Sequence, residues 1–253
     1  PRTVALASLL VVGLSACFGG DSTPSTTGAP QTMTIADLDA AIGPAAQLVL
    51  DNAAVEATTI YFDFEDPERV YRYDWMTSRA NGDSIVASND LDQKVVTAFV
   101  QVGDDRFNAT ATELATEKWF RFGSALPPPE GTLPLLLATQ LADGVVLTMD
   151  QGPRPVTVIR QEAADGSVVW TLTSPTADGG DTEATHEWII DRDGALWFYR
   201  MESPQTPISE SARTIVTRFS VPEDQDPIAP PELGTGLNLK QLGVPEELLD
   251  LSK

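Results

Sequence analysis

The sequence predicts an α+β fold in which a strongly curved antiparallel sheet of about ten strands covers a few helices. Three observations predict this fold. Apolar and polar residues alternate along most of the chain, turn residues separate the alternating segments, and helix signals occur in only a few places. Because no linker interrupts the long central part of the 253-residue chain, we expect it to form one domain with one core.

The first residues are typical of a bacterial lipoprotein signal. Arg2 precedes the apolar run Ala5–Leu14, and small residues then lead to Cys17. We expect residues 1–16 to be a signal peptide and the thiol of Cys17 to carry acyl chains such as palmitate. The apolar run has about ten residues, too few for the roughly 20 that span a bilayer, so the acyl chains would hold the protein to the membrane. The alternative is an ordinary secretory signal with an incidental cysteine.

Composition divides the remaining chain into three parts. Residues 17–32 are rich in Gly, Ser, Thr and Pro and have almost no apolar side chains, which predicts a flexible tether from the lipidated Cys17. Residues 33–231 form the predicted domain. Residues 232–253 form a C-terminal tail, in which Pro245 starts a short leucine-containing helix.

Helix signals occur at two places in the predicted domain. Thr34 is a suitable N-cap for a helix over Ile35–Ala54, which Gly43-Pro44 should break or kink. Its predicted apolar stripe consists of Ile35, Leu38, Ile42, Leu48 and Val49. A second helix over Leu133–Ala142 is apolar nearly all round, which predicts that it is buried.

The strands follow from period-two alternation. In Thr58–Glu65, for example, every second residue is apolar. The turns Asn81-Gly82, Asp165-Gly166 and Asp193-Gly194 each connect two such segments, as expected for hairpins. The alternating segments are 58–65, 70–76, 84–88, 94–102, 106–112, 118–122, 156–161, 167–173, 187–191, 195–202 and 213–221. We therefore expect a meander of hairpins.

This order of elements resembles the LolA/LppX-like lipoprotein and lipid carriers, a family that includes actinobacterial lipoproteins of the cell envelope. The resemblance covers about Ile35 to Pro231. It rests on the architecture and on the ending Phe219–Pro231, which runs Phe-Ser-Val-Pro-Glu-Asp-Gln-Asp-Pro-Ile-Ala-Pro-Pro. It implies a half-barrel sheet around helices, with an apolar cavity that holds acyl chains or a lipidated protein.

The predicted concave face is rich in aromatic and branched side chains, which an acyl chain could cover. The alternative for each of these residues is ordinary core packing. The candidate cavity-lining residues are Ile60, Phe62, Phe64, Tyr71, Tyr73, Trp75, Val100, Leu136, Leu137, Leu141, Trp170, Trp188 and Phe198.

The net charge and the cysteine content exclude one class of partner and one source of stability. The chain has 37 acidic against 16 basic residues and a net charge of −21, which would repel nucleic acids. With Cys17 lipidated, no other cysteine remains for a disulfide.

The residues of common catalytic sites are scarce. His186 is the only histidine, no nucleophile-elbow sequence surrounds it, and we expect it to be a solvent-facing strand residue. Zinc ligands are too few. Asp191–Gly194 has the acidic spacing of part of a calcium loop, but further ligands do not follow, so we expect a hairpin turn. We therefore predict no enzyme activity, no metal and no cofactor.

The sequence supports three functional hypotheses. The first is a monomeric lipoprotein on the extracytoplasmic face of the cell membrane, anchored through Cys17, which binds lipid acyl chains and carries or transfers lipid. The second is a non-catalytic sensor or interaction module that binds another envelope protein through the curved sheet. The third is a hydrolase of wall polymers, which would need two carboxylates in one cleft.

Overall fold

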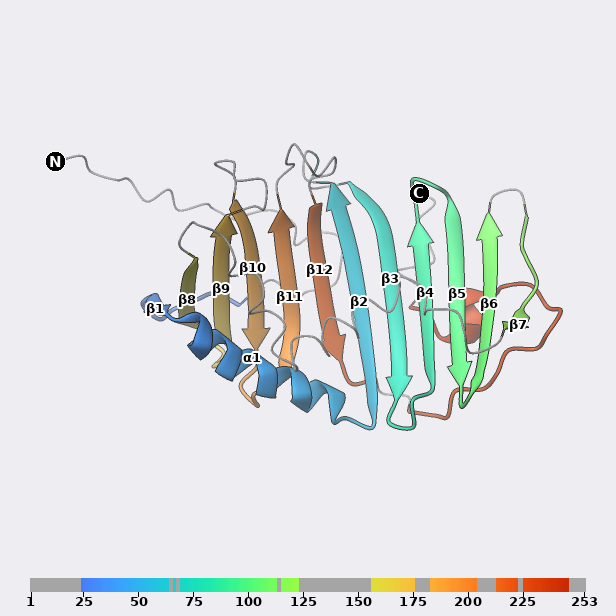
Figure 1. The fold of residues 1–253 in the computed structure, drawn as a ribbon, viewed down its shortest axis with the longest axis horizontal. Coiled ribbons are helices and arrows are strands. Elements are labelled where there is room, and N and C mark those ends of the chain that lie inside the picture. Colours follow the sequence, from blue (N-terminus) through green and yellow to red (C-terminus); the bar gives the residue numbers. More distant parts are fainter. Residues whose placement is uncertain are drawn as a thin grey trace.

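In a computed structural model, the described residues form an open antiparallel sheet with one α-helix along it (Figure 1). The structure describes residues 24–63, 66, 69–112, 115–122, 156–175, 183–203, 213–222 and 225–245. Within these ranges, twelve strands form a single sheet that does not close on itself. The predicted fold class is therefore confirmed. The predicted helix Leu133–Ala142 and the predicted helix after Pro245 lie outside the described residues.

The described elements are the following, in chain order: β1 (Gln31–Met33), α1 (Ile35–Leu50), β2 (Ala54–Asp63), β3 (Val70–Arg79), β4 (Ser84–Asp90), β5 (Val95–Val102), β6 (Asp105–Thr112), β7 (Phe120–Phe122), β8 (Thr157–Glu162), β9 (Val168–Pro175), β10 (Glu183–Ile190), β11 (Leu196–Ser203), β12 (Arg213–Ser220) and the 3₁₀ helix η3 (Leu239–Leu242).

The strand order shows two meanders side by side. Strands β2 to β7 follow one another across one half, β8 to β12 follow one another across the other half, and β12 pairs with β2 where the halves meet. Our prediction of one meander in sequence order was wrong at this point. The turns were predicted correctly: Gly82 and Gly194 have φ angles of 88° and 91°, which a residue with a side chain rarely adopts.

Helix α1 explains the strand order. β1 is an edge strand beside β8, whereas β2 begins in the middle of the sheet, six strand spacings away. At about 4.8 Å per spacing this distance is about 29 Å. A helix of 16 residues is about 24 Å long. With the residues that flank it, α1 crosses β8 to β12 and delivers the chain to the centre (Figure 1).

The start of α1 is as predicted. Thr34 caps it, since its Oγ1 accepts a hydrogen bond from the Asp37 backbone N–H at 3.2 Å and its own N–H donates to the Asp37 carboxylate at 2.9 Å. The buried stripe consists of Leu38, Ile42, Ala45, Ala46 and Val49. Leu48, predicted to belong to it, is 46% exposed.

The predicted break at Gly43-Pro44 is absent, because α1 continues to Leu50. Pro44 is exposed to solvent. Ile42 and Ala45, on either side of it, are buried against the sheet. We infer that this packing outweighs the lost hydrogen bond, which costs about 3 kcal/mol in an isolated helix.

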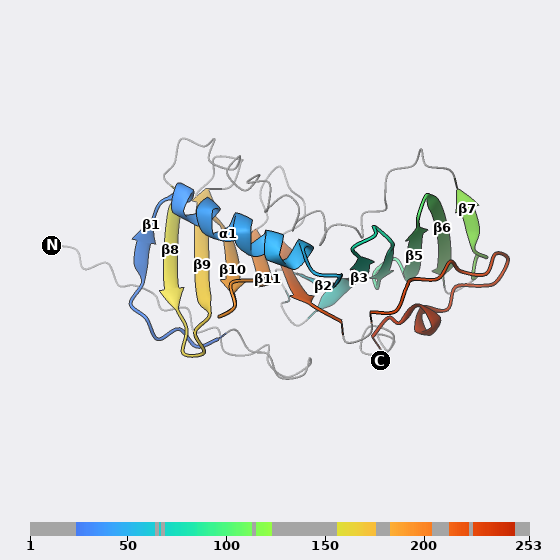
Figure 2. The ribbon, with the colours of Figure 1, turned by 90° about the horizontal axis from the view of Figure 1, so that it is seen from below.

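The two faces of the sheet are covered at opposite ends (Figure 2). We call the side that contacts α1 the helix face. Its core joins the buried stripe of α1 to sheet residues from β2 to β5 and from β8 to β12. We call the opposite side the far face. There Ile228 and Val244, from residues 225–245, are buried on a cluster that includes Tyr73, Trp75 and Val100.

The described part of the chain extends beyond the predicted domain at both ends. Within the predicted tether, Thr26 bridges Ala163, and Gln31 and Thr32 lie in β1, paired with β8. Within the predicted tail, η3 and Val244 pack on the far face. Alternation could not reveal either segment, because three-residue strands and irregular chain carry no periodic signal.

We expect Pro44→Ala to stabilise the protein. Alanine restores a backbone donor to α1, and position 44 is exposed, so the substitution removes no packing. The free energy of unfolding in urea should rise by about 1 kcal/mol, less than the full helix penalty because proline also restricts the unfolded chain. The control is Pro230→Ala, which lies outside α1. A loss of stability in Pro44→Ala would contradict this account.

Candidate functional site

A row of side chains crosses the helix face at the centre of the sheet. Strand pairing places Trp188, Tyr199, Thr217, Thr59 and Asp74 side by side on β10, β11, β12, β2 and β3. All five are buried. We call them the central row. Its polar members are unusual for a core, so their partners decide what this surface can do.

Asp74 is held by two neighbours. The Arg72 guanidinium donates to both carboxylate oxygens, at 2.8 and 3.0 Å, and the Tyr61 hydroxyl donates to one of them at 2.9 Å. The guanidinium also lies 5.2 Å from the centre of the Tyr61 ring. Burial, with Asp74 as a further cause, raises the pKa of Tyr61 far above its ordinary value. Beside this group, the hydroxyls of Thr59 and Thr217 share a hydrogen bond of 3.0 Å.

His186 lies beside the central row and is buried, so our prediction of a solvent-facing residue was wrong. Pairing with Leu172 and Met201 turns its ring toward the helix face. Its Nδ1 is 3.0 Å from the Tyr199 hydroxyl, and its ring stacks on Trp188 with 5.7 Å between centres. Burial lowers the pKa of His186 to about 4 and raises the pKa of Tyr199.

These groups favour binding over proton transfer. His186 is neutral at pH 7, and the tyrosines on either side of the sheet centre hold their protons. Asp74 is occupied by Arg72 and Tyr61, so it is poorly placed to act as a base. The carboxylate and hydroxyl groups of the central row are therefore paired inside the core, where no member of the row is more than 5% exposed.

Among the described residues of the helix face, one buried donor has no acceptor. The indole Nε1 of Trp188 makes no hydrogen bond. A buried N–H without a partner costs free energy, so it marks a place where a ligand oxygen would be favourable.

The predicted lining residues do not share one face. Trp170 and Trp188 lie on the helix face beneath α1. Five others lie on the far face, in or against the cluster that includes Ile228 and Val244. They are Ile60, Phe62, Tyr73, Trp75 and Val100. Phe198 packs with Val169 and Ile189, also on the far face. Tyr71 is half-buried, with its ring 6.0 Å from that of Tyr61.

Five predicted residues remain outside the described ranges. They are Cys17, Phe64, Leu136, Leu137 and Leu141. The described helices include none with the length and apolar character needed to cross a bilayer.

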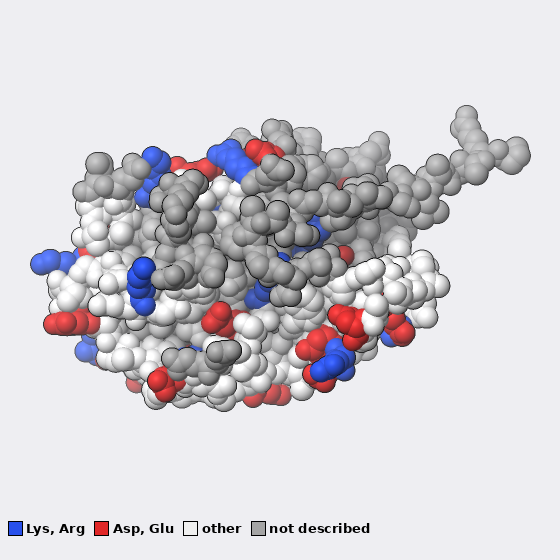
Figure 3. Space-filling view, turned by 180° about the vertical axis from the view of Figure 1, so that it is seen from behind, with Lys and Arg blue, Asp and Glu red and all other residues white. Residues whose placement is uncertain are grey.

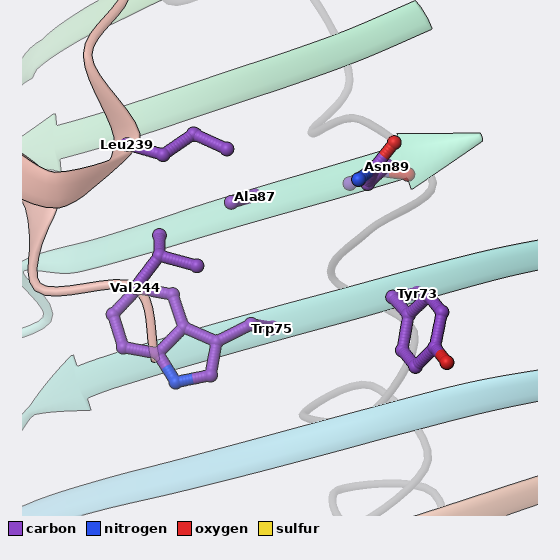
Figure 4. A pocket seen from close by; sticks show the side chains of 7 residues that line it. Tyr73, Trp75, Ala87, Asn89, Leu239 and Val244 are labelled. Atoms are coloured by element: carbon purple, nitrogen blue, oxygen red, sulfur yellow. The ribbon is translucent and has the colours of Figure 1, made fainter. Parts of the chain in front are cut away.

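Tyr73 and Trp75 line a small cavity between the far face and the C-terminal segment (Figure 4). Its other lining residues are Ala87, Ser88, Asn89, Leu239 and Val244. The cavity volume is about 10 Å³, room for about one water molecule. An acyl chain would therefore have to displace the C-terminal segment to bind there.

Sequence reasoning named Trp188 of the central row but missed its other members. The available signal was that Arg72 and Asp74, two residues apart in a strand, share a face between aromatic neighbours. Their pairing with Tyr61 follows only from the register of β2 with β3.

Comparisons with known proteins are sparse. No family model and no curated protein sequence match the chain. A solved structure of a LolA superfamily protein from Nitrosomonas europaea is similar with 13% identity and a TM-score of 0.27, over 70% of this chain and 91% of that one. At this level of similarity we base no argument on the likeness, and the family resemblance seen in the sequence stays a prediction.

His186 should make stability depend on pH. The unfolded chain takes up a proton on this imidazole below pH 6.5, whereas the folded chain does so only near pH 4. The contribution of His186 to the free energy of unfolding is therefore fully present above pH 6.5. It decreases by about 3 kcal/mol in total as the pH falls toward 4. We expect His186→Gln to remove this part of the slope in urea unfolding measured from pH 7 to pH 4. The control Thr185→Gln should keep it, and equal slopes in both variants would refute the assignment.

Proposed function

We propose that the protein is a monomeric, lipid-anchored lipoprotein on the extracytoplasmic face of the cell membrane, and that it binds lipid acyl chains on the helix face. It has no catalytic activity and uses no cofactor. Its role is to carry or transfer lipid in the cell envelope. The signal-like residues before Cys17 support the anchor, and the geometry of the helix face supports the ligand.

The observation that carries the ligand proposal is the extent of the apolar helix face. The twelve strands span about 53 Å at about 4.8 Å per spacing, whereas α1 is about 24 Å long and ends beside β2. Beyond it, Met76, Val86 and Phe99 continue the same core over β3 to β5. These three side chains are only 0%, 2% and 3% exposed, so an acyl chain would have to displace the atoms that cover them, and it would gain about 0.8 kcal/mol for each methylene that it buries.

The polar groups of the helix face suit the headgroup end of such a lipid. The indole N–H of Trp188 is buried and unpaired, so an ester or carboxyl oxygen of a lipid could bind to it only when the atoms that cover it are displaced. The neighbouring His186 is neutral, so it would neither attract nor repel a charged headgroup.

The second candidate is a non-catalytic module that binds another envelope protein through the sheet. The small far-face cavity favours it, because a filled interior leaves only outer surfaces for recognition. So does Phe120 on the edge strand β7, which is 45% exposed. The experiments below distinguish the two candidates.

We expect a photoreactive palmitate analogue to label alternate residues of the sheet. After delipidation, the purified protein should retain this ligand, and its diazirine should attach to Met76, Val86 or Phe99. Their neighbours Trp75 and Val100 point to the far face and should remain unlabelled. Mass spectrometry of the digested protein reads out the pattern. Failure to retain the ligand would favour the interaction module. Labelling of the far face alone would show that the ligand does not bind on the helix face, contrary to this proposal.

A matched pair of substitutions tests the same site by affinity. Phe99 and Phe107 are both buried on neighbouring strands, but on the helix face and the far face respectively. Phe99→Ala should weaken palmitate binding roughly tenfold, equivalent to about 1.4 kcal/mol. Phe107→Ala should leave the affinity unchanged, although each variant loses about 3–5 kcal/mol of stability. Circular dichroism confirms folding at the assay temperature, and equal losses of affinity would count against a helix-face site.

The anchor has its own test. Cys17→Ser should abolish incorporation of radiolabelled palmitate in a bacterial host and move the protein from the membrane fraction to the soluble one. Ser25→Ala, within the predicted tether, should keep both the label and the membrane location. Persistence of the label in Cys17→Ser would show that the cysteine is incidental.

A further inference from the structure

The first described residues are attached to the edge of the sheet by backbone hydrogen bonds. The Ser25 carbonyl accepts from the Ala164 N–H at 3.2 Å. The N–H groups of Thr27 and Gly28 both donate to the Glu162 carbonyl, each at 3.0 Å. These bonds lie within the stretch that the sequence predicts to be a flexible tether, and they hold it to the end of β8.

Gly28 permits this close approach. A Cβ atom at this position would lie 3.1 Å from the Glu162 nitrogen and 3.3 Å from the Glu162 Cβ, closer than side chains usually come. Beyond Gly28, β1 pairs with β8 over three residues, and Met33 packs against the core of the helix face. We call residues 25–33 the paired segment. Because backbone bonds hold its start and core packing holds its end, it moves with the domain.

The pairing shortens the distance that the chain can bridge from Cys17. Eight peptide steps separate Cys17 from Ser25, and at about 3.6 Å or less per step they span about 29 Å at most, whatever their conformation. Counted to Thr32, the end of the predicted tether, the limit would be about 54 Å. A bilayer that holds the acyl chains of Cys17 therefore also holds the β1–β8 edge of the sheet close to its surface.

The proposed acyl-chain site lies in the other half of the sheet. Met76, Val86 and Phe99 are on β3, β4 and β5, which are six to eight strand spacings from β8. At about 4.8 Å per spacing, this separation is about 29–38 Å. The chain is thus attached at one edge of the sheet and would bind its ligand in the opposite half.

Charge disfavours an arrangement in which the sheet lies flat on the bilayer. The chain has a net charge of −21, so a surface that contains anionic lipid repels it. On the described part of the far face, basic side chains are scattered and form no continuous patch that would offset this repulsion (Figure 3). The short connection keeps the β1–β8 edge near the bilayer, whereas repulsion moves the rest of the domain away from it.

We propose that the anchored protein stands on its β1–β8 edge, with β2 to β7 directed away from the bilayer. The surface that faces the lipid headgroups consists of the paired segment, β8 and the β8–β9 turn. The acyl-chain site is then held away from the membrane in which the protein is anchored. This inference rests on the proposed anchor and deepens it, because it specifies the orientation in which the ligand is presented.

Energy transfer from a dye on an introduced cysteine to acceptor-labelled headgroups tests the orientation. Acylation uses Cys17, so the introduced cysteine is the only free thiol. The lipidated protein is placed in vesicles of phosphatidylethanolamine and phosphatidylglycerol. The two dye positions are exposed alanines, Ala164 in the β8–β9 turn and Ala115 between β6 and β7.

We expect at least about twofold stronger transfer from Ala164→Cys than from Ala115→Cys, because nine spacings, about 43 Å, separate β8 from β6. Equal transfer from both positions would show that the sheet lies flat or turns freely, and it would overturn the proposal.

Gly28→Val tests whether the pairing sets this orientation. The valine side chain would clash with Glu162 and release the start of the paired segment, so the chain between Cys17 and β1 could reach about 50 Å. The ratio of transfer between the two dye positions should then fall toward one. Ala29→Val, at the exposed neighbouring position, is the matched control and should keep the ratio. A ratio that Gly28→Val leaves unchanged would contradict the proposal.

Hydrogen exchange separates this inference from the lipid anchor itself. In the protein without acyl chains, the amides of Thr27 and Gly28 should exchange at least about tenfold more slowly than in an unpaired chain. Absence of this protection would overturn the inference and leave the anchor proposal intact. If Cys17→Ser instead shows that the cysteine is incidental, the anchor proposal and this inference both fail, even with the amides protected.

Discussion

A single open sheet with apolar side chains on both faces must be covered twice, and the rest of this structure depends on that constraint. Helix α1 covers β8 to β12 on one face, and residues 225–245 cover β3 to β6 on the other. The first cover also determines topology, because α1 carries the chain from the edge strand β1 to the central strand β2. One 16-residue helix thus buries a core and brings together two meanders that are far apart in sequence.

The polar groups inside this sheet fall into two kinds. Asp74, Tyr61 and Arg72 satisfy one another, as do the hydroxyls of Thr59 and Thr217, so they fix the register of the central strands at little cost. Glu187 and Arg200 instead retain buried atoms without partners. Such atoms lower the stability of the fold, because they have left water without gaining a partner.

The sequence predicted local structure well because local rules determine it. Asn81-Gly82 and Asp193-Gly194 specify hairpins through the positive φ of their glycines, and the capping box at Thr34 starts α1. Which face a strand turns to the helix depends on contacts between distant residues. For this reason Trp75 and Trp188, which look alike in the sequence, bury their rings on opposite sides.

Other errors had tertiary causes. Pro44 should interrupt a helix, yet burial of the residues around it keeps α1 continuous. His186 is polar and lies in an alternating strand, which favours exposure, but the pairing of β9, β10 and β11 turns it inward. The pairing of β12 with β2 could not be predicted from the sequence, because no local pattern indicates that two strands about 150 residues apart are neighbours.

The register of β10 with β11 determines which of their side chains face α1. Trp188 and Tyr199 face α1, while their chain neighbours Glu187 and Arg200 face the opposite side. A slip of one residue in β10 would bury Glu187 beneath α1 and expose the Trp188 ring, at a cost of several kcal/mol. The irregularity between Ile189 and Ile190 makes such a slip harder, since a bulge fits one register only. The same strand pair therefore places buried aromatic rings on one face of the sheet and charged side chains on the other.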